Sequence, residues 1–310
     1  MLTPLQKRTA QAIVNIFETG VVAGDYGNVT LIPGDTAHLT FGRTQAMLGS
    51  GDLAKLLSQY SNNEGARFGG RIRAALGRFI TGDPALDTDM KMHNLLRATA
   101  DDPVMRATQD SFFDETSWQP AEKSAARAGI ETPLGLTVVY DSTLHGSWKS
   151  LRDRTIQRSG TVSSLGEKRW IEAYIRTRRQ WLAGHQRKDL RATVYRMDAF
   201  KRLTDQDDWG LELPLVVRGL EISEAALNAI PPGCYDSPQP GSRILELRTP
   251  MLRGLDVRLV QLALSDQGYD VQADGIFGKS SMRSVRAYQL KASLPVTGVM
   301  DSELIARLVT

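Results

Sequence analysis

The chain has 310 residues, of which 41% are hydrophobic and 24% are charged, which is ordinary for a globular protein. Its net charge of +3 and sequence pI of about 9.0 suit an anionic polymer as partner. The sequence has no apolar run long enough to span a membrane, no zinc-finger spacing and no HExxH pair of histidines. We therefore expect no membrane, nucleic acid, metal or cofactor partner.

The first expected element is an amphipathic helix over residues 5–19, because apolar residues recur there at helical spacing. Thr3 before Pro4 has the pattern of an N-cap, and Gly20 has that of a helix stop. The segment lacks a continuous apolar stretch after its charges, so it does not have the pattern of a secretory signal. We expect the protein to be made in the cytoplasm without one.

Residues 26–42 alternate between apolar and polar residues around a PGD turn, which predicts a short hairpin or an extended excursion. A helix is then expected from GSGDLAKLLSQY, with Asp52 as its N-cap. From there to about residue 205 the pattern is mostly helical. A long helix near 165–184 places Trp170, Tyr174, Arg178 and Trp181 on one face. These patterns predict a first domain that is mainly α with a small β element.

Residues 231–249 are rich in Pro, Gly and Ser, so they are the strongest candidate for a linker. The single cysteine, Cys234, lies there in PPGCYDSP, which has the composition of an exposed loop. No intrachain disulfide can form, and no helix start or base is visible that would activate the thiol. We expect no catalytic role for it.

Two carboxylates near the N-terminus are candidates for catalytic residues. Glu18 ends the first apolar helix, Asp35 lies on a Gly- and Pro-flanked loop, and Thr40 follows on the expected strand. Glycoside hydrolysis needs one carboxylic acid for the leaving oxygen and a second carboxylate to activate water or to attack. The residues alone fit equally an exposed Glu at a helix end and an Asp in a turn.

The C-terminal run from Gly254 resembles peptidoglycan-binding domains of the three-helix type. The family pattern is a Val–x–x–Val/Leu–Gln helix, then D-G-x-F-G, a helix ending in an aromatic–Gln pair, a Gly turn and a last helix. The residues that fit are Val257, Val260, Gln261, Asp274, Gly275, Phe277, Gly278, Val285, Tyr288, Gln289, Gly298 and Leu308. The resemblance implies wall binding, although such a fold also serves as a spacer or a protein-docking unit.

The stretch from Gln6 to about Arg202 resembles the chitosanases of glycoside hydrolase family 46. This resemblance implies an α+β, mainly α fold with a lysozyme-like, two-lobed catalytic domain beside the small three-helix module. It also implies that Glu18 is the general acid, Asp35 the general base, Thr40 the residue that orients water and Asp52 a sugar contact. DDPVMRATQDSFFDE and LTVVYDSTLHGS resemble two further segments of the family.

The same resemblance implies a buried Arg–Asp–Arg network formed by Asp141, Arg178 and Arg196. Its role would be structural support and not chemistry. The intervening length differs from the family pattern, which makes the two arginines the less secure part of the match.

Two departures from the family pattern concern the substrate. Family members carry an Arg two residues after the general base, where this chain has Ala37. They also carry acidic residues shortly before the second Arg of the network, where this chain has the basic stretch GHQRKDLRATVYR, in which Asp189 is the only acid. A basic wall repels cationic chitosan and attracts an anionic glycan–peptide. Such a charge run is equally often a solvated face.

Three hypotheses follow. The first is an inverting endo-β-1,4-glycosidase of peptidoglycan, the second a chitosanase, and the third a non-catalytic wall-binding protein on a decayed scaffold. The expected organisation is a hydrolase domain at 1–230, a linker at 231–249 and a peptidoglycan-binding domain at 250–310. We expect a monomer that reaches the wall through lysis or non-standard export.

Overall fold

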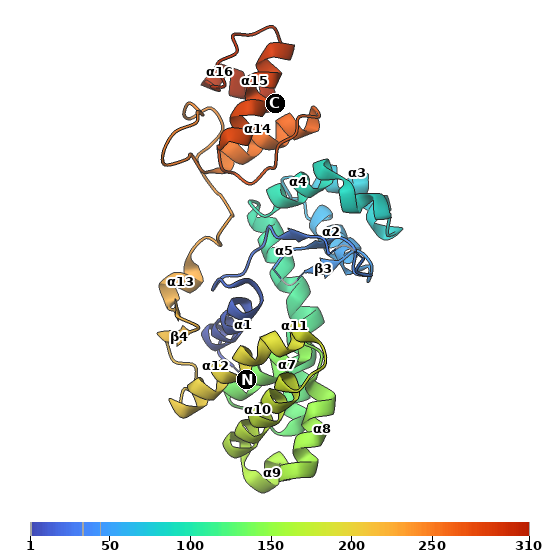
Figure 1. Cartoon of the computed structure of the whole chain (residues 1–310), viewed down its shortest axis with the longest axis vertical. Helices are drawn as coiled ribbons and strands as arrows, with labels where there is room; N and C mark the ends of the chain where they lie inside the picture. Colours follow the sequence, from blue (N-terminus) through green and yellow to red (C-terminus); the bar gives the residue numbers. More distant parts are fainter. Residues whose placement is uncertain (1, 33, 44, 310) are drawn as a thin grey trace. The chain divides into compact units, whose positions relative to one another are not determined.

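The computed structural model describes residues 2–32, 34–43 and 45–309. The chain divides into two compact units, each made of two stretches of sequence. Unit 1 contains residues 1–24 and 112–229, and unit 2 contains residues 25–111 and 230–310. In Figure 1 the deep blue, green and yellow ribbon forms unit 1, and the lighter blue, teal and orange-to-red ribbon forms most of unit 2.

Unit 1 is a bundle of helices with one two-stranded antiparallel ribbon. Its helices are α1 (Pro4–Thr19), η2 (Asp114–Trp118), α6 (Gln119–Ala128), α7 (Pro133–Leu144), α8 (Trp148–Ser159), α9 (Val162–Leu165), α10 (Glu167–Ala183), α11 (Lys188–Arg191), η3 (Ala192–Val194), α12 (Tyr195–Asp205) and α13 (Glu224–Asn228). The strands β4 (Leu215–Val217) and β5 (Leu220–Ile222) pair with each other.

The first helix forms as its sequence predicts. Thr3 caps α1 and accepts a hydrogen bond from the Gln6 backbone N–H, while the Gln6 side chain accepts one from the Thr3 N–H. This capping box satisfies two of the backbone donors that a helix start leaves open. Gly20 ends the helix at a φ of 75°, a left-handed conformation that costs glycine little. The buried face of α1 then packs into the main core of unit 1.

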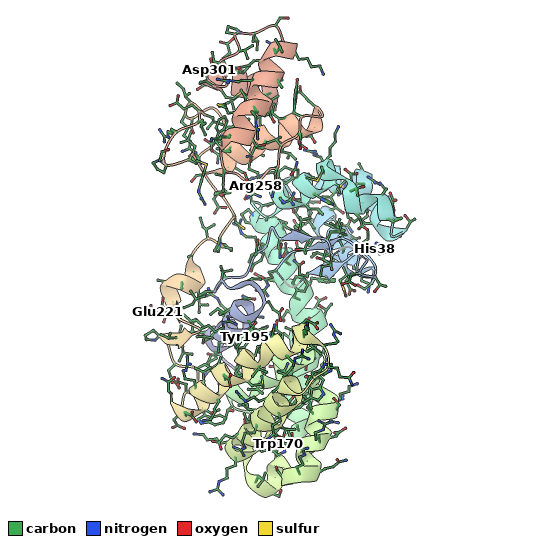
Figure 2. All side chains as sticks on the ribbon, viewed as in Figure 1. His38, Trp170, Tyr195, Glu221, Arg258 and Asp301 are labelled. Atoms are coloured by element: carbon green, nitrogen blue, oxygen red, sulfur yellow. The ribbon has the colours of Figure 1, made fainter. Side chains whose placement is uncertain are left out.

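The long helix near 165–184 is α10, and its aromatic face enters the same core. Trp170 stacks on Tyr174 with ring centroids 5.6 Å apart, and Trp148 of α8 packs edge-on to Trp170 at 6.1 Å. Both α10 rings are fully buried, whereas Trp181 is partly exposed at the end of the face. Figure 2 labels Trp170 within these helices.

Unit 2 combines a small sheet with two groups of helices. The strands β1 (Val29–Thr30), β2 (Thr40–Phe41) and β3 (Ala46–Met47) form an antiparallel sheet in sequence order. The helices are α2 (Asp52–Ser61), α3 (Gly69–Ile80), η1 (Pro84–Thr88), α4 (Met90–Thr99) and α5 (Pro103–Phe113), whose last two residues belong to unit 1. The C-terminal helices are α14 (Leu255–Asp266), α15 (Lys279–Lys291) and α16 (Ser302–Val309).

Two sequence expectations for unit 2 are corrected. Gly51, at a φ of 79°, precedes α2, so Asp52 is the first helical residue and not the N-cap. Cys234 is buried beside Tyr26 and Ala100, whereas its local sequence predicts an exposed loop. Burial raises the pKa of the thiol to about 12, so it is protonated and unreactive at neutral pH.

The three C-terminal helices enclose a core of their own, and two glutamines hold its turns. Gln261 accepts a hydrogen bond from the Gly275 N–H at 2.8 Å, and Gln289 accepts one from the Gly298 N–H at 2.8 Å. Each glutamine also donates to a backbone carbonyl of the same turn, namely those of Ile276 and Val299. Buried amides that are satisfied in this way fix the loops that connect the helices.

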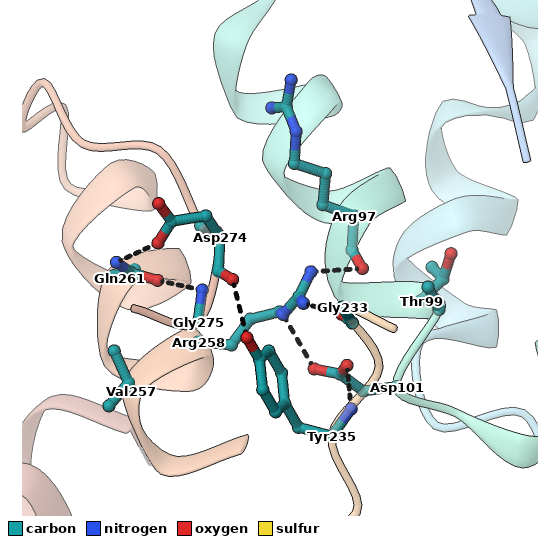
Figure 3. Close-up of polar contacts among 12 residues, drawn as sticks. Arg97, Thr99, Asp101, Gly233, Tyr235, Val257, Arg258, Gln261, Asp274 and Gly275 are labelled. Atoms are coloured by element: carbon teal, nitrogen blue, oxygen red, sulfur yellow. Dashed lines mark hydrogen bonds and ion pairs between the residues drawn. The ribbon is translucent and has the colours of Figure 1, made fainter. Parts of the chain in front are cut away.

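Within unit 2, α14 packs against α4 through polar groups that are buried. Asn94 donates to Ser265 and to the Val271 carbonyl and accepts from the Ala273 N–H, with distances of 2.8–2.9 Å. Arg258 of α14 donates to the Arg97 carbonyl at 2.9 Å and to the Gly233 carbonyl, and its Nε lies 3.0 Å from Asp101. Figure 3 shows this guanidinium between α4 and the chain at 233–235.

Within the described ranges, no helix is long and apolar enough to cross a membrane. The same residues contain no group of three or more His, Cys, Asp or Glu side chains placed to hold a metal ion.

Candidate active site

Glu18 lies in the last turn of α1 in unit 1, and its side chain is 38% exposed. Its Oε1 accepts a hydrogen bond from Arg196 Nη1 at 2.8 Å. The preceding residue, Phe17, is buried under the Arg196 guanidinium, and its carbonyl accepts a hydrogen bond from the Tyr195 hydroxyl at 2.8 Å. The carboxylate is therefore open to solvent while its helix end and one oxygen are held in place.

The support of Glu18 continues into a buried charge cluster. Arg196 Nη1 also donates to Asp141 at 2.8 Å, and Arg178 Nη1 donates to the other oxygen of Asp141. Arg178 is held by Ser142 at 2.9 Å and Ser147 at 3.0 Å. The structure thus brings Asp141, Arg178 and Arg196 together, as the family resemblance implies.

The ionisation of this cluster follows from its charges. Burial raises the pKa of Asp141, but the two guanidinium groups outweigh it, so the pKa of Asp141 lies below its ordinary value. For Arg196, desolvation is outweighed by Asp141 and Glu18, which raise its pKa. Burial and the two arginines lower the pKa of His145, which is therefore neutral at pH 7. The cluster stays ionised and holds Arg196 toward Glu18.

Asp35 belongs to unit 2 and lies in the turn between β1 and β2. Its Oδ1 accepts a hydrogen bond from the Ala37 N–H at 3.1 Å, which is an Asx turn. The Asp35 N–H donates to the Ile32 carbonyl at 3.0 Å, and the His38 N–H donates to the Asp35 carbonyl at 3.3 Å. The exposed carboxylate therefore sits on a turn that its own hydrogen bonds shape.

Thr40 lies on β2, the central strand of the sheet, opposite Thr30 and Met47. Its hydroxyl is within hydrogen-bond reach of the Thr30 carbonyl at 3.1 Å and of Gln45 Oε1, while Gln45 donates to the Gly42 carbonyl at 2.8 Å. Both neighbours of the hydroxyl are acceptors, so its proton is committed to one of them. The lone pairs of the Thr40 oxygen then remain for a hydrogen from water.

Asp52 opens α2 in the same unit and is 37% exposed. It accepts hydrogen bonds from Ser50 at 2.8 Å and from Lys55 at 3.1 Å. The candidate residues thus divide between the units. Glu18 and its supporting cluster belong to unit 1, and Asp35, Thr40 and Asp52 belong to unit 2.

The basic stretch of residues 184–196 connects α10 to α12. Arg187 and Asp189 form an exposed ion pair with side chains that are 68% and 62% exposed. Arg191 donates to the carbonyls of His185 and Gln186 at 2.6 and 2.7 Å. The single acid of this stretch is therefore neutralised by its neighbour, and the remaining exposed charge is positive.

Comparison with known proteins decides the family. The model of glycosyl hydrolase family 46 matches residues 12–215, and that of a putative peptidoglycan binding domain matches residues 253–308. The chain belongs to glycosyl hydrolase family 46. This membership makes it a glycoside hydrolase of amino-sugar polysaccharides, with a peptidoglycan-binding domain at its C-terminal end.

Several chitosanases are similar to this chain. The chitosanase of Bacillus subtilis (strain 168) is 28% identical over 234 residues, which cover 70% of this chain and 83% of the relative. A mutant chitosanase from Bacillus subtilis MY002, complexed with 6 GlcN, matches with a TM-score of 0.57 and 26% identity over 70% of this chain and 96% of its own. The family 46 chitosanase of Gynuella sunshinyii with chitotetraose, at 23% identity and a TM-score of 0.57, covers 72% of this chain and 98% of its own and shares the fold. The expected mainly α, chitosanase-like fold is therefore confirmed.

Some residues at the site escape sequence analysis. Gln45 holds the Thr40 hydroxyl, and Asp87 of η1 holds His38 beside Asp35. No spacing pattern marks the second pair, because 49 residues separate its members. The aberrant φ of 57° at Gln45 is likewise visible only in the backbone.

Proposed function

We propose that this protein is an inverting endo-β-1,4-glycosidase that hydrolyses the glycan of peptidoglycan outside the cytoplasm. Glu18 is the general acid, Asp35 is the general base that activates water, Thr40 orients that water and Asp52 contacts a sugar. In an inverting enzyme, one carboxylic acid protonates the leaving oxygen while the other carboxylate takes the proton of the attacking water. The exposure of Glu18 and Asp35 suits groups that must meet a polymer.

The observation that carries the choice of substrate is the peptidoglycan-binding domain on the same chain. A module that binds an insoluble polymer raises the effective concentration of the attached enzyme on that polymer. Two features of the hydrolase region support the same substrate. Ala37 stands where the family pattern has an arginine, and the stretch around Arg187 is basic, which favours an anionic glycan–peptide.

Chitosan is the second candidate, and it is favoured by the relatives. The chitosanase of Bacillus subtilis (strain 168) is similar over most of this chain, and the mutant structure was solved with 6 GlcN. The same acid and base chemistry cleaves both polymers, because the scissile bond in each is a β-1,4 glycosidic bond. What differs is the charge of the sugar substituents, which are ammonium groups in chitosan and acetamido and lactyl–peptide groups in peptidoglycan.

The deciding experiment digests purified sacculi and chitosan side by side, with products identified by mass spectrometry. The variants are wild type, Glu18→Gln and a matched control, Glu172→Gln, which changes an exposed glutamate of α10 in the same unit. Soluble muropeptides from wild type and the control, with at least a hundredfold loss in Glu18→Gln, are the expected result. The new reducing ends identify the bond that is cut, and NMR of the fresh product distinguishes inversion from retention.

Other outcomes separate the alternatives. Glucosamine oligomers from chitosan with intact sacculi would make the protein a chitosanase and the basic stretch a solvated face. Binding to sacculi with no product from either polymer would favour a non-catalytic wall-binding protein. Equal activity of Glu18→Gln and wild type would remove Glu18 from the role of general acid.

A further inference from the structure

His38 has an unusual backbone three residues after Asp35. Its φ is 55°, in the left-handed region that non-glycine residues rarely adopt. A residue held in such a conformation persists only where its surroundings over-determine it, and strained residues of this kind cluster at functional sites. Figure 2 labels His38 in the part of unit 2 that contains the small sheet.

Asp87 of η1 holds this conformation with both carboxylate oxygens. Its Oδ2 lies 2.8 Å from His38 Nδ1, and its Oδ1 accepts the Leu39 N–H at 2.8 Å. A carboxylate at Nδ1 selects the tautomer that carries its proton there. Among the described residues, no group is hydrogen-bonded to Nε2 on the opposite side of the ring, and the His38 side chain is 42% exposed.

His38 borders a hollow that Asp35 also lines. This hollow has a volume of about 330 Å³ and is lined by Leu31, Ile32, Gly34, Asp35, Thr36, His38 and Asp87. Two of its lining side chains are apolar and exposed to solvent: Leu31 is 37% exposed and Ile32 is 60% exposed. The hollow therefore combines an apolar wall, one ring nitrogen with hydrogen-bonding capacity and the proposed general base.

We propose that this hollow binds the acetamido group of an N-acetylated amino sugar next to the bond that is cut, with His38 as the specificity-determining residue. The methyl group packs against Leu31 and Ile32, and the polar end of the acetamide hydrogen-bonds to His38 Nε2. This inference rests on the proposed function, because it assigns a substrate group to the site of Asp35.

An acetamide fits this hollow better than an ammonium group does. An ammonium gains nothing from the apolar wall and loses hydration there. Asp87 would attract a cation, but each of its oxygens already has one hydrogen-bond partner, His38 or Leu39, which reduces what it offers to an ammonium group. The remaining carboxylate is Asp35, whose proposed partner is the attacking water. The acetamide uses the apolar wall and His38 Nε2 and leaves that base free for the water.

The test uses His38→Gly, because glycine adopts a φ of 55° without strain and removes only the imidazole. The ligands are equal-length oligomers of N-acetylglucosamine and of glucosamine, bound to full-length Glu18→Gln with and without His38→Gly and measured by calorimetry. We expect His38→Gly to weaken binding of the acetylated oligomer about tenfold and of the glucosamine oligomer less than twofold. Ile32→Ser should weaken only the acetylated oligomer, about fourfold.

Hydrolysis of partially acetylated chitosan by otherwise wild-type protein gives a second readout. Sequencing the products should show N-acetylglucosamine enriched on one fixed side of the cut, and His38→Gly should abolish that enrichment. Equal weakening of both oligomers, or an enrichment that survives His38→Gly, would overturn the inference. Absence of hydrolysis by wild type of both partially acetylated chitosan and purified sacculi would overturn the proposed function instead, while the calorimetry would still decide whether the hollow selects an acetamide.

Discussion

Each unit of this protein contains a cluster in which arginine and aspartate are both buried, around Asp141 in unit 1 and around Asp101 in unit 2, and these two clusters are built differently. In the unit 1 cluster, Asp141 accepts hydrogen bonds from Arg178 and Arg196, so two cations share one buried anion. In the unit 2 cluster, Asp101 faces one buried arginine, Arg258, at 3.0 Å. Both aspartates are buried, so the main difference between the clusters is the number of arginines that contact the aspartate directly.

The ratio of charges sets the sign of the pKa shift. Burial raises the pKa of both carboxyls, but for Asp141 the two arginines outweigh that effect and lower it. For Asp101, burial outweighs the attraction of Arg258, the hydrogen bond from the Tyr235 N–H and the smaller attractions of Arg67 and Arg106, and the pKa rises to about 6. One buried arginine is thus too little to keep a buried aspartate at its ordinary acidity.

The ratio of arginines to aspartate also decides which other groups each cluster contacts. The excess cation of the unit 1 cluster reaches outward, because Arg196 binds Glu18 as well as Asp141. Among the residues that the structure describes, the unit 2 cluster makes no contact with a surface carboxylate of the site, because Arg258 donates its other hydrogen bonds to the backbone carbonyls of Arg97 and Gly233. The first arrangement orients a surface carboxylate, and the second fastens the C-terminal helices to α4.

The largest effect is expected from Asp141→Asn compared with Asp101→Asn. Removing the single anion between two buried arginines should destabilise the protein by about 3–5 kcal/mol. Asp101→Asn should cost far less, because that carboxyl is protonated at pH values below about 6 and its neutral form already resembles Asn. Denaturant unfolding at pH 5 measures both. Equal losses would show that charge number does not govern these clusters.

The next effect concerns the attachment of α14 to α4. Asn94→Ala removes three hydrogen bonds to Ser265, Val271 and Ala273 and should lower the stability of this junction by about 2–3 kcal/mol. Hydrogen exchange of the α14 amides, together with proteolysis at residues 230–249, measures that opening. The matched control is Arg243→Gln, which removes the pair with Asp256 inside the C-terminal helices. Faster opening in the control alone would contradict this account of the junction.

A pH effect of about 2 kcal/mol is expected from Asp101. Its folded pKa of about 6 lies above the ordinary 3.8, so the folded state binds the proton more tightly. Its contribution to stability should therefore increase as pH falls from 7 to 4.5. Buried His93, whose pKa is lowered by burial, changes stability in the opposite direction over the same range.

The difference between wild type and Asp101→Asn isolates the aspartate, because His93 is common to both proteins. The stability of wild type should rise relative to that of Asp101→Asn as pH falls. A difference that is flat between pH 7 and 4.5 would contradict the raised pKa.

The smallest effect is expected from Arg196→Lys. A lysine keeps the charge but lacks the planar fork, so it cannot reproduce the geometry that links Asp141 with Glu18. We expect kcat on the cleaved polymer to fall about tenfold, which corresponds to about 1.4 kcal/mol, with little change in KM. Arg179→Gln breaks an exposed pair with Asp198 between α10 and α12, the helix that carries Arg196, and should leave kcat unchanged. A similar loss in both variants would indicate a general effect of the helix pair.

Local patterns in the sequence predict the elements whose signals are local. Thr3, Pro4 and Gly20 specify α1 because capping groups bond to backbone within one turn. The aromatic spacing from Trp170 places one face of α10 in the core. The family motifs likewise identify a glycoside hydrolase, because they extend over the whole hydrolase region.

Other features were decided only by the tertiary structure, since their partners are distant in sequence. Cys234 is buried although its loop composition predicts exposure, because the fold packs it on Tyr26 and Ala100. Asp87 contacts His38, and Asp101 contacts Arg258, but no spacing pattern in the sequence predicts either pair. The sequence by itself determined the helices, the family and the acidic residues proposed for catalysis. Burial and long-range charge pairing, which depend on the packed chain as a whole, decided how those residues are held and ionised.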